Sequence, residues 1–264
     1  MISATIIFFS PTGNTRKVCE VIKNTLDKEF QTKLCDITYP AAREKLLSEN
    51  LSGDLLVVAV PVYAESVEEI ITNFFRMAQL NFAKAIVICT YGCISAGAAI
   101  SDIIRVLKYK NISVIASAKI PARHNFALAG IKDLSDKNSY DYSTLISDFI
   151  VKACKKNDKL KQRYRLHFSK LIPHKILVRL TSYVPSTNLE ICSKCNICVK
   201  VCPTGAIKSD VTTDKNACIS CAACVINCQT EARKLVFRSK IPKIYLKHGI
   251  ENSIRKQIKP NFYL

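Results

Sequence analysis

Short apolar runs alternate with longer stretches of helical periodicity over the first 155 residues of the chain. Five stretches predict strands, at residues 3–9, 33–37, 55–60, 85–89 and 112–118; the first is expected to be buried, the second is short and the third is strongly apolar. Helices are predicted after residue 16 and over residues 41–47, 65–80, 96–108 and 142–155. This alternation, without a hairpin signature, predicts an α/β fold with a doubly wound, five-stranded parallel sheet.

The stripe of the helix predicted over residues 65–80 contains four apolar side chains, Ile70, Ile71, Phe74 and Met77. We expect these side chains to face the sheet.

Three loops follow predicted strands at the edge where a doubly wound sheet binds its ligands: residues 10–15, 61–66 and 90–97. The first combines hydroxyl side chains with a helix N-terminus, which is an anion-binding arrangement, and Gly13 allows close backbone approach. Neither G-x-G-x-x-G nor G-x4-G-K-[ST] is present in it. An ordinary helix N-cap with a turn is the alternative.

This first loop resembles the FMN phosphate loop of flavodoxins. The resemblance implies that five residues hold the phosphate of FMN, namely Ser10, Thr12, Gly13, Asn14 and Thr15. In flavodoxin-like proteins the two later loops flank the isoalloxazine ring, which makes Tyr63 and Tyr91 candidates for stacking and Gly92 a candidate for close approach. Alternatively, each tyrosine anchors its own loop, and Gly92 only satisfies the geometry of a turn. Cys93, His124 and Asn125 lie nearby without a firm assignment.

Eight cysteines between residues 192 and 228 form two copies of C-x2-C-x2-C-x3-C. In such a run three thiolates reach one cubane and the fourth reaches the other cluster. The expected ligand sets of two [4Fe-4S] clusters are therefore Cys192, Cys195, Cys198 with Cys228, and Cys218, Cys221, Cys224 with Cys202. A disulfide framework and zinc sites are the structural alternatives.

The double motif resembles the bacterial two-cluster ferredoxins over roughly residues 186–240, which implies a small α+β domain that carries single electrons. Pro203 follows the first motif, whereas Gln229 stands where a second proline is expected. Gln229 restores a backbone N–H beside Cys228, which leaves ligation intact but affects rigidity and potential.

Residues 156–185 form a predicted basic linker, and residues 241–264 a basic tail with a short helix near residues 250–258. Apolar residues interleave with the basic ones in the linker, which favours a helix that packs on the body of the protein. Contact with a membrane surface or with nucleic acid is the alternative, and the nucleic-acid interpretation is the less favoured.

The composition changes this picture mainly through charge and cysteine content. The 264 residues carry a formal net charge of +18, contain 13 cysteines and show no export signal or membrane-spanning run, so we expect a reducing, cytoplasmic location. A basic surface favours an acidic redox partner, although a general solubility bias would also produce it.

The whole chain thus resembles a fusion of a flavodoxin-like domain (residues 1–155) with a two-cluster ferredoxin domain (residues 186–240). The resemblance implies an electron-transfer protein that couples two-electron chemistry at FMN to one-electron chemistry at two [4Fe-4S] clusters. One alternative is an enzyme in which the flavin, supplied by the clusters, reduces a quinone, a nitro compound or an oxygen species. Another is a basic binding protein in which the clusters are structural.

Overall fold

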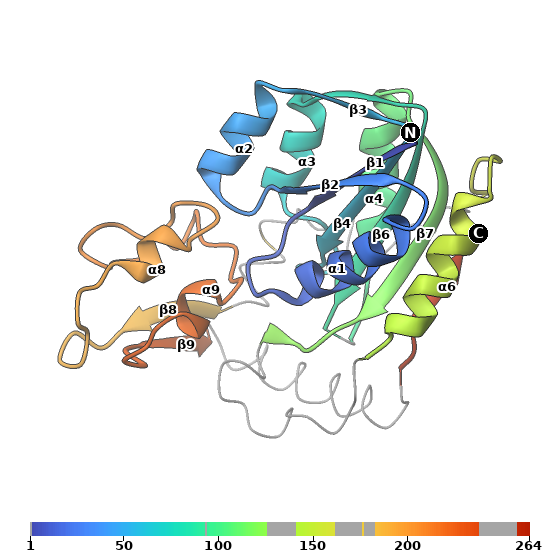
Figure 1. The fold of residues 1–264 in the computed structure, drawn as a ribbon. Helices are drawn as coiled ribbons and strands as arrows, with labels where there is room; N and C mark the ends of the chain where they lie inside the picture. Colours follow the sequence, from blue (N-terminus) through green and yellow to red (C-terminus); the bar gives the residue numbers. More distant parts are fainter. Residues whose placement is uncertain (1, 93, 126–140, 162–175, 177–182, 238–257) are drawn as a thin grey trace.

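The computed structural model describes residues 2–92, 94–125, 141–161, 176, 183–237 and 258–264. Its central feature is a six-stranded sheet with the strand order β10-β7-β6-β4-β1-β2 (Figure 1). The five parallel strands are β1 (Ser3–Phe8), β2 (Gln31–Asp36), β4 (Leu55–Pro61), β6 (Lys84–Tyr91) and β7 (Ser113–Pro121). Numbered along the chain, they stand in the order 2-1-3-4-5, which is the flavodoxin-like arrangement. The predicted parallel, doubly wound sheet is confirmed.

Helices cover both faces of the sheet because its central strands are apolar on both sides. In β4, Leu55, Val57 and Ala59 pack toward one core cluster, and the alternate residues pack toward the other. The helices α1 (Asn14–Leu26) and α6 (Ser143–Cys154) contribute to the first cluster. The helices α2 (Pro40–Leu47), α3 (Glu69–Met77) and α4 (Ala99–Tyr109) contribute to the second. Both faces of the sheet are therefore closed to solvent.

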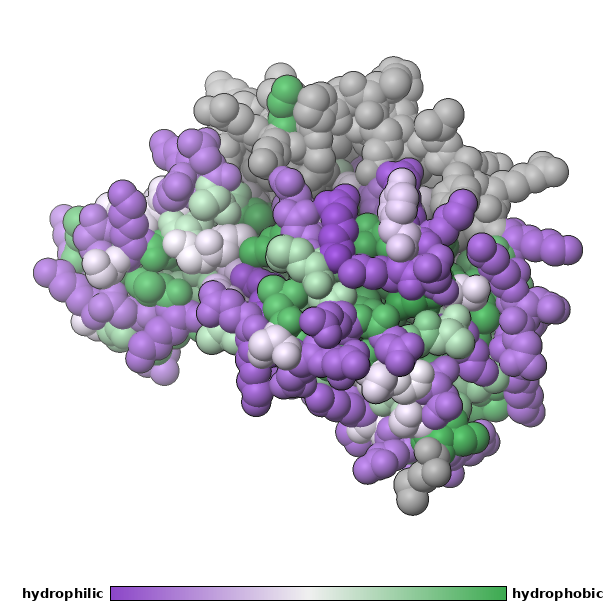
Figure 2. Space-filling view, turned by 90° about the horizontal axis from the view of Figure 1, so that it is seen from above, coloured by the Kyte–Doolittle hydropathy of each residue, from purple (hydrophilic) through white to green (hydrophobic). Residues whose placement is uncertain are grey.

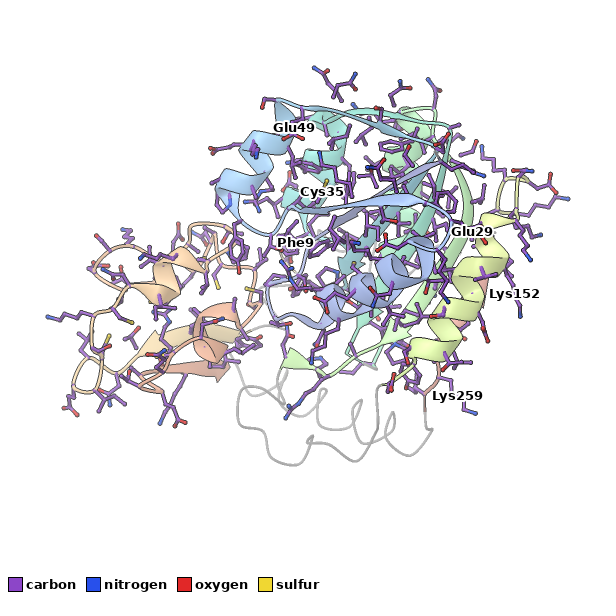
Figure 3. The ribbon with its side chains drawn as sticks, viewed as in Figure 1. Phe9, Glu29, Cys35, Glu49, Lys152 and Lys259 are labelled. Carbon is purple, nitrogen blue, oxygen red and sulfur yellow. The ribbon has the colours of Figure 1, made fainter. Side chains whose placement is uncertain are left out.

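The side chains divide between the two cores and the surface. Phe9 and Cys35 lie within the layers, whereas Glu49, Lys152 and Lys259 lie at the periphery (Figure 3). Seen from above, most of the described surface is hydrophilic, with apolar residues in separate patches (Figure 2). None of the helices in the described ranges is long and apolar enough to cross a membrane.

The sheet has one strand more than predicted. The C-terminal strand β10 (Asn261–Tyr263) pairs antiparallel with β7, and its Phe262 stacks on Phe149 of α6 with ring centroids 4.8 Å apart. The count of five strands is thus correct for the parallel part and one short for the whole sheet. The helix predicted near residues 250–258 lies almost wholly outside the described residues.

The helix predicted over residues 65–80 is shorter than expected at both ends. Tyr63 and Ser66 exchange backbone hydrogen bonds, which delays the start of α3. After Met77 the chain forms β5 (Gln79–Phe82), which pairs with β3 (Asn50–Gly53) in a small parallel sheet. Met77 was assigned to the buried stripe, but it is 62% exposed, and Phe75 takes the buried position.

The cysteine-rich region forms a small unit of two short helices and a two-stranded antiparallel sheet. The helices are α8 (Ile197–Lys200) and α9 (Ala223–Ile226), and the strands are β8 (Tyr183–Thr187) and β9 (Arg233–Phe237). Strand β8 begins within the stretch that the sequence assigned to the linker. Most of that basic linker lies outside the described residues, although Leu160 near its start donates a backbone hydrogen bond to Val114.

Candidate functional site

The three predicted loops meet at the carboxyl ends of the parallel strands around one hollow. It encloses about 810 Å³ of space between atoms, which includes space open to solvent. Seven of the eight residues predicted to bind the flavin line it: Ser10, Thr12, Asn14, Thr15, Tyr63, Tyr91 and Gly92. Gly13, the eighth, is the residue that precedes α1. The hollow therefore lies where the strand order reverses, between β1 and β4.

The phosphate-loop end of the hollow is organised around the start of α1. Gly13 has φ of 84°, and a Cβ atom there would meet nothing within 4 Å, so this backbone conformation rather than crowding favours glycine. Ser10 is held on both sides, because its backbone N–H donates to the Thr38 hydroxyl at 2.8 Å and its Oγ accepts from the Arg16 N–H at 2.9 Å. A helix N-terminus beside hydroxyl groups fits a phosphate.

Two more of the predicted phosphate-loop residues are tied to other parts of the α/β unit. The hydroxyl of Thr15 is buried and shares a 2.8 Å hydrogen bond with the hydroxyl of Thr90 on β6. The side chain of Asn14 donates to the carbonyl of Arg123 at 2.9 Å. Both contacts tie the loop to neighbouring elements, so these residues shape the site as well as line it.

The two later loops contribute the predicted aromatic side chains of the hollow, Tyr63 and Tyr91. Tyr91, at the end of β6, is 7% exposed. Gly92 follows it, and a Cβ atom at Gly92 would lie 2.1 Å from Cδ2 of His124. Glycine is thus required there because the imidazole occupies the space of a side chain. The stacking of Tyr63 or Tyr91 on a flavin ring stays a prediction.

A fourth segment, after β7, completes the hollow with Arg123, His124 and Asn125. Burial lowers the pKa of His124 to about 4, so the ring is neutral near pH 7. Asn125 connects two parts of the molecule: its Oδ1 lies 3.5 Å from the Thr12 hydroxyl, and its Nδ2 donates to the Cys221 carbonyl at 3.1 Å. In the sequence, the position of His124 and Asn125 after the last parallel strand placed them near the other loops, but it did not define a role for either residue. Cys93 lies outside the described residues.

The wall of the hollow also includes the cysteine-rich unit, which the sequence did not predict. Tyr183, Ile219 and Ser220 line the hollow, and Ile219 packs against the apolar core of the α/β unit. Arg43 of α2 donates to the Pro203 carbonyl at 2.6 Å, from a position that is 8% exposed. The two units therefore dock through an apolar contact at Ile219 and a buried hydrogen bond at Pro203.

A second hollow lies within the cysteine-rich unit. Four cysteines line it, namely Cys202, Cys218, Cys221 and Cys224, together with apolar residues such as Ile207 and Ala223. This is the ligand set predicted from the crossed motif, with the fourth cysteine taken from the other half. We call it the inner set, because Cys202, Cys221 and Cys224 are buried. The backbone N–H of Ala206 donates to the Cys202 sulfur at 3.3 Å. An apolar hollow with four thiols and an N–H donor to sulfur fits a cubane.

The remaining four cysteines, Cys192, Cys195, Cys198 and Cys228, form the outer set. Cys195 is exposed, and the others are partly exposed. Within the described ranges, no group of three or more His, Cys, Asp or Glu side chains converges as a single metal ion requires. A cubane needs no such convergence, because each thiolate binds a different iron atom.

The two halves of this unit have the same backbone at a spacing of 26 residues. Left-handed residues occur in three matched pairs: Lys194 and Ser220, Asn196 and Ala222, Gly205 and Glu231. The helices α8 and α9 also match at this spacing. The match extends past Pro203 and Gln229. The sulfur of Cys202 lies 3.7 Å from the hydroxyl of Thr204, and the sulfur of Cys228 lies 3.8 Å from the hydroxyl of Thr230. Gln229 therefore leaves the conformation of the second half unchanged.

Comparisons with known proteins match one family model and several solved structures to parts of the chain. The 4Fe-4S binding domain family matches residues 185–208. Comparison with curated proteins finds no match. A flavodoxin from Streptococcus pneumoniae TIGR4 is 15% identical, with 57% of this chain and 97% of that chain covered and a TM-score of 0.39. An archaeal flavodoxin is 16% identical (58% and 99% covered, TM-score 0.36).

A third solved structure is a longer protein. Rubredoxin oxygen:oxidoreductase from Desulfovibrio gigas is 12% identical, with 58% of this chain and 36% of that chain covered and a TM-score of 0.38. The chain thus contains a 4Fe-4S binding domain after a flavodoxin-like α/β unit, whose fold is established by its own strand order.

Proposed function

We propose that the chain is an electron-transfer protein that relays electrons between FMN and two [4Fe-4S] clusters. We call the hollow at the carboxyl ends of the parallel strands the flavin hollow. The main support is that the loop of one cysteine ligand set forms part of this hollow. Ile219 and Ser220 line that hollow, and the next residue, Cys221, belongs to the inner set. A protein in which the cysteine-rich unit only stabilised the fold would not need this loop to meet the flavin site.

The two ligand sets differ in exposure, which supports a spatial order of the cofactors from the surface to the flavin hollow. The outer set includes the exposed Cys195 and could exchange electrons with a partner at the surface. The inner set is mostly buried beside the flavin hollow. Electrons would pass between a surface partner, the outer cluster, the inner cluster and FMN. When bound, FMN can hold one or two electrons, whereas each cluster carries one, so the arrangement couples the two kinds of redox chemistry.

The proposed partner is an acidic one-electron carrier. The chain carries a formal net charge of +18, and the exposed side chains of Lys194 and Lys200 lie close in sequence to Cys195 of the outer set. Opposite charges accelerate encounter and are screened by salt. The rate of reduction by an acidic ferredoxin should therefore fall as ionic strength rises, and a rate independent of salt would argue against this partner.

The function is tested on anaerobically purified protein. We expect about eight iron atoms and one FMN per chain, as two four-iron clusters and one flavin require. A Cys221→Ser variant should lose part of this iron, keep its FMN and receive electrons at the flavin much more slowly from a reduced ferredoxin. Cys154→Ser, which changes a partly exposed cysteine outside both motifs, is the matched control and should behave as the unmodified protein.

Two results would count against the relay. Flavin reduction by ferredoxin at an unchanged rate in Cys221→Ser would show that electrons bypass the inner cluster. Steady turnover of a quinone or nitro compound, with electrons from the clusters, would make the protein a flavin-dependent reductase instead.

A further inference from the structure

Arg233, the first residue of β9, is a buried cation in the cysteine-rich unit. It is only 2% exposed. Its two terminal nitrogens donate to neutral oxygens: Nη1 to the Thr187 hydroxyl at 2.7 Å and the Val211 carbonyl at 2.8 Å, and Nη2 to the Thr213 hydroxyl at 2.6 Å. Among the described residues, no carboxylate forms an ion pair with it. A guanidinium in this position has lost its hydration without gaining a protein anion.

One donor of the same group also lacks an oxygen or nitrogen acceptor. The Nε–H of Arg233 is buried and reaches no such atom among the described residues. A buried donor without a strong acceptor is costly, and buried donors in native proteins are almost always paired. The charge and this N–H together indicate an anion that accepts hydrogen bonds through sulfur.

Arg233 lies beside the hollow of the inner set, because Thr213, which accepts from its Nη2 at 2.6 Å, lines this hollow together with Cys224. Burial raises the pKa of Cys224, and the charge of Arg233 and a hydrogen bond from its side chain oppose that rise. Burial likewise raises the pKa of Cys198 in the outer set, and the charge of Arg233 again opposes the rise most. The buried positive charge therefore acts on a cysteine of each ligand set.

We propose that Arg233 is the internal counter-charge of the two iron–sulfur clusters, with its Nε–H donating to a sulfur of the inner cluster. This inference rests on the proposed function, because it requires clusters in both ligand sets. A cluster held by four thiolates is an anion, and each electron that it accepts adds a negative charge. Net charge and hydrogen bonds to sulfur are among the factors that set cluster potentials. Arg233 stabilises the reduced form of each cluster and raises the reduction potential of both.

The chain provides a control for the charge itself. Lys234 is the next residue on β9 and is exposed, because successive side chains of a strand point to opposite faces. Its ammonium group is surrounded by water, where charges act weakly on buried sites. Replacing Arg233 or Lys234 by methionine removes one positive charge in each case, but only the first replacement removes a buried charge beside the inner set.

The test is a redox titration of the full-length, cluster-loaded protein, followed by EPR. In Arg233→Met, the ratio of reduced to oxidised cluster at a fixed potential should fall at least tenfold, which equals a shift of 59 mV for one electron. Lys234→Met should change this ratio less than twofold. Arg233→Lys, which keeps the charge but not the guanidinium fork, should retain most of the potential yet shift the Fe–S stretching bands in resonance Raman spectra, because the N–H···S bond is lost.

Several outcomes would overturn the proposal. One is an Arg233→Met protein with a full iron content and unchanged potentials. If Arg233→Met does not take up iron, the Arg233→Lys variant is used instead. Unchanged potentials together with unchanged Fe–S bands in this variant would contradict the proposed hydrogen bond from Arg233 to the cluster. A matching shift in Lys234→Met would make the effect one of overall charge. The iron count of the unmodified protein is measured first, because fewer than about eight iron atoms per chain would contradict the two-cluster function rather than the role of Arg233.

Discussion

Gly92 and His124 are packed so closely in the flavin hollow that no side chain fits at residue 92. A Cβ atom at Gly92 would lie 2.1 Å from the imidazole, far inside van der Waals contact. Both residues line the hollow, so any shift that relieves the clash changes the shape of the site.

Gly92→Ala should therefore weaken FMN binding. Displacing a packed ring or the backbone costs about 1–3 kcal/mol, which corresponds to roughly a 5- to 150-fold increase in the dissociation constant if the cost falls on the bound state. Fluorescence titration of the flavin-free protein with FMN measures this change directly.

The double variant Gly92→Ala, His124→Ala is the control, because it removes the group that the new methyl would strike. We expect it to bind FMN more tightly than Gly92→Ala alone. Equal weakening in the single and double variants would show that Gly92 acts through the backbone rather than through His124.

Individual residues were predictable where spacing along the chain determines the geometry. The cysteine runs are local, so the motif predicted that Cys202 would join Cys218, Cys221 and Cys224, and these four line one hollow. Asn125 and Tyr183 were not assigned to the site, because their roles arise from contacts between distant segments. A single asparagine or tyrosine carries no pattern that reveals such contacts.

At the scale of elements, the strength of the local signal decided what the sequence could predict. Four of the five parallel strands are largely buried on both faces and consist of nearly continuous apolar residues, which made them easy to find. The fifth, the edge strand β2, is mostly exposed or partly buried and was found as a short strand at residues 33–37. Strands β3, β5 and β10 have three or four residues each and lie at edges or outside the main sheet. Such short segments are too brief to show a period, and their pairing comes from tertiary contacts.

The strand β10 makes a testable contribution to the stability of the α/β unit. Phe262 stacks on Phe149 at an angle of 25°, and the strand covers the edge of β7. Because Phe262 is only partly buried, Phe262→Ala should lower the unfolding free energy by about 1–3 kcal/mol, less than a fully buried phenylalanine. Its thermal midpoint, followed by circular dichroism without air, should fall by several degrees.

Iron and FMN contents of Phe262→Ala should stay unchanged, since β10 lies at the sheet edge far in strand order from β1. Leu264→Ala, at a residue that is 46% exposed, is the matched control and should melt with the unmodified protein. An unchanged midpoint for Phe262→Ala would mean that the strand adds no stability to the sheet.

At the scale of the whole molecule, the docking of the two units was the feature that sequence could not predict. It depends on scattered residues, each with an ordinary local environment in the sequence. Arg43 is one of them: its Nη1 donates to the carbonyls of Ile37 and Thr38 at 2.9 and 2.7 Å within the α/β unit, and its Nη2 reaches the Pro203 carbonyl. Burial lowers the pKa of the guanidinium. Arg43 therefore fixes the loop that carries Cys202 against the flavin-binding unit.

Arg43→Met should separate cofactor binding from cofactor communication. The variant leaves the Pro203 carbonyl without its donor, and a buried hydrogen bond to a charged group contributes about 1.5–3 kcal/mol, enough to lower the docked fraction substantially. Iron and FMN contents should remain normal, because Arg43 belongs to neither ligand set and does not line the flavin hollow. After rapid reduction of the clusters, electrons should appear on the flavin more slowly, since transfer falls steeply with distance. Arg76→Met, which replaces an exposed arginine on α3 that donates to Asn73 of the same helix, is the control. Equal transfer rates in both variants would show that docking does not depend on Arg43, whereas loss of iron in Arg43→Met alone would place its role in the assembly of the inner cluster.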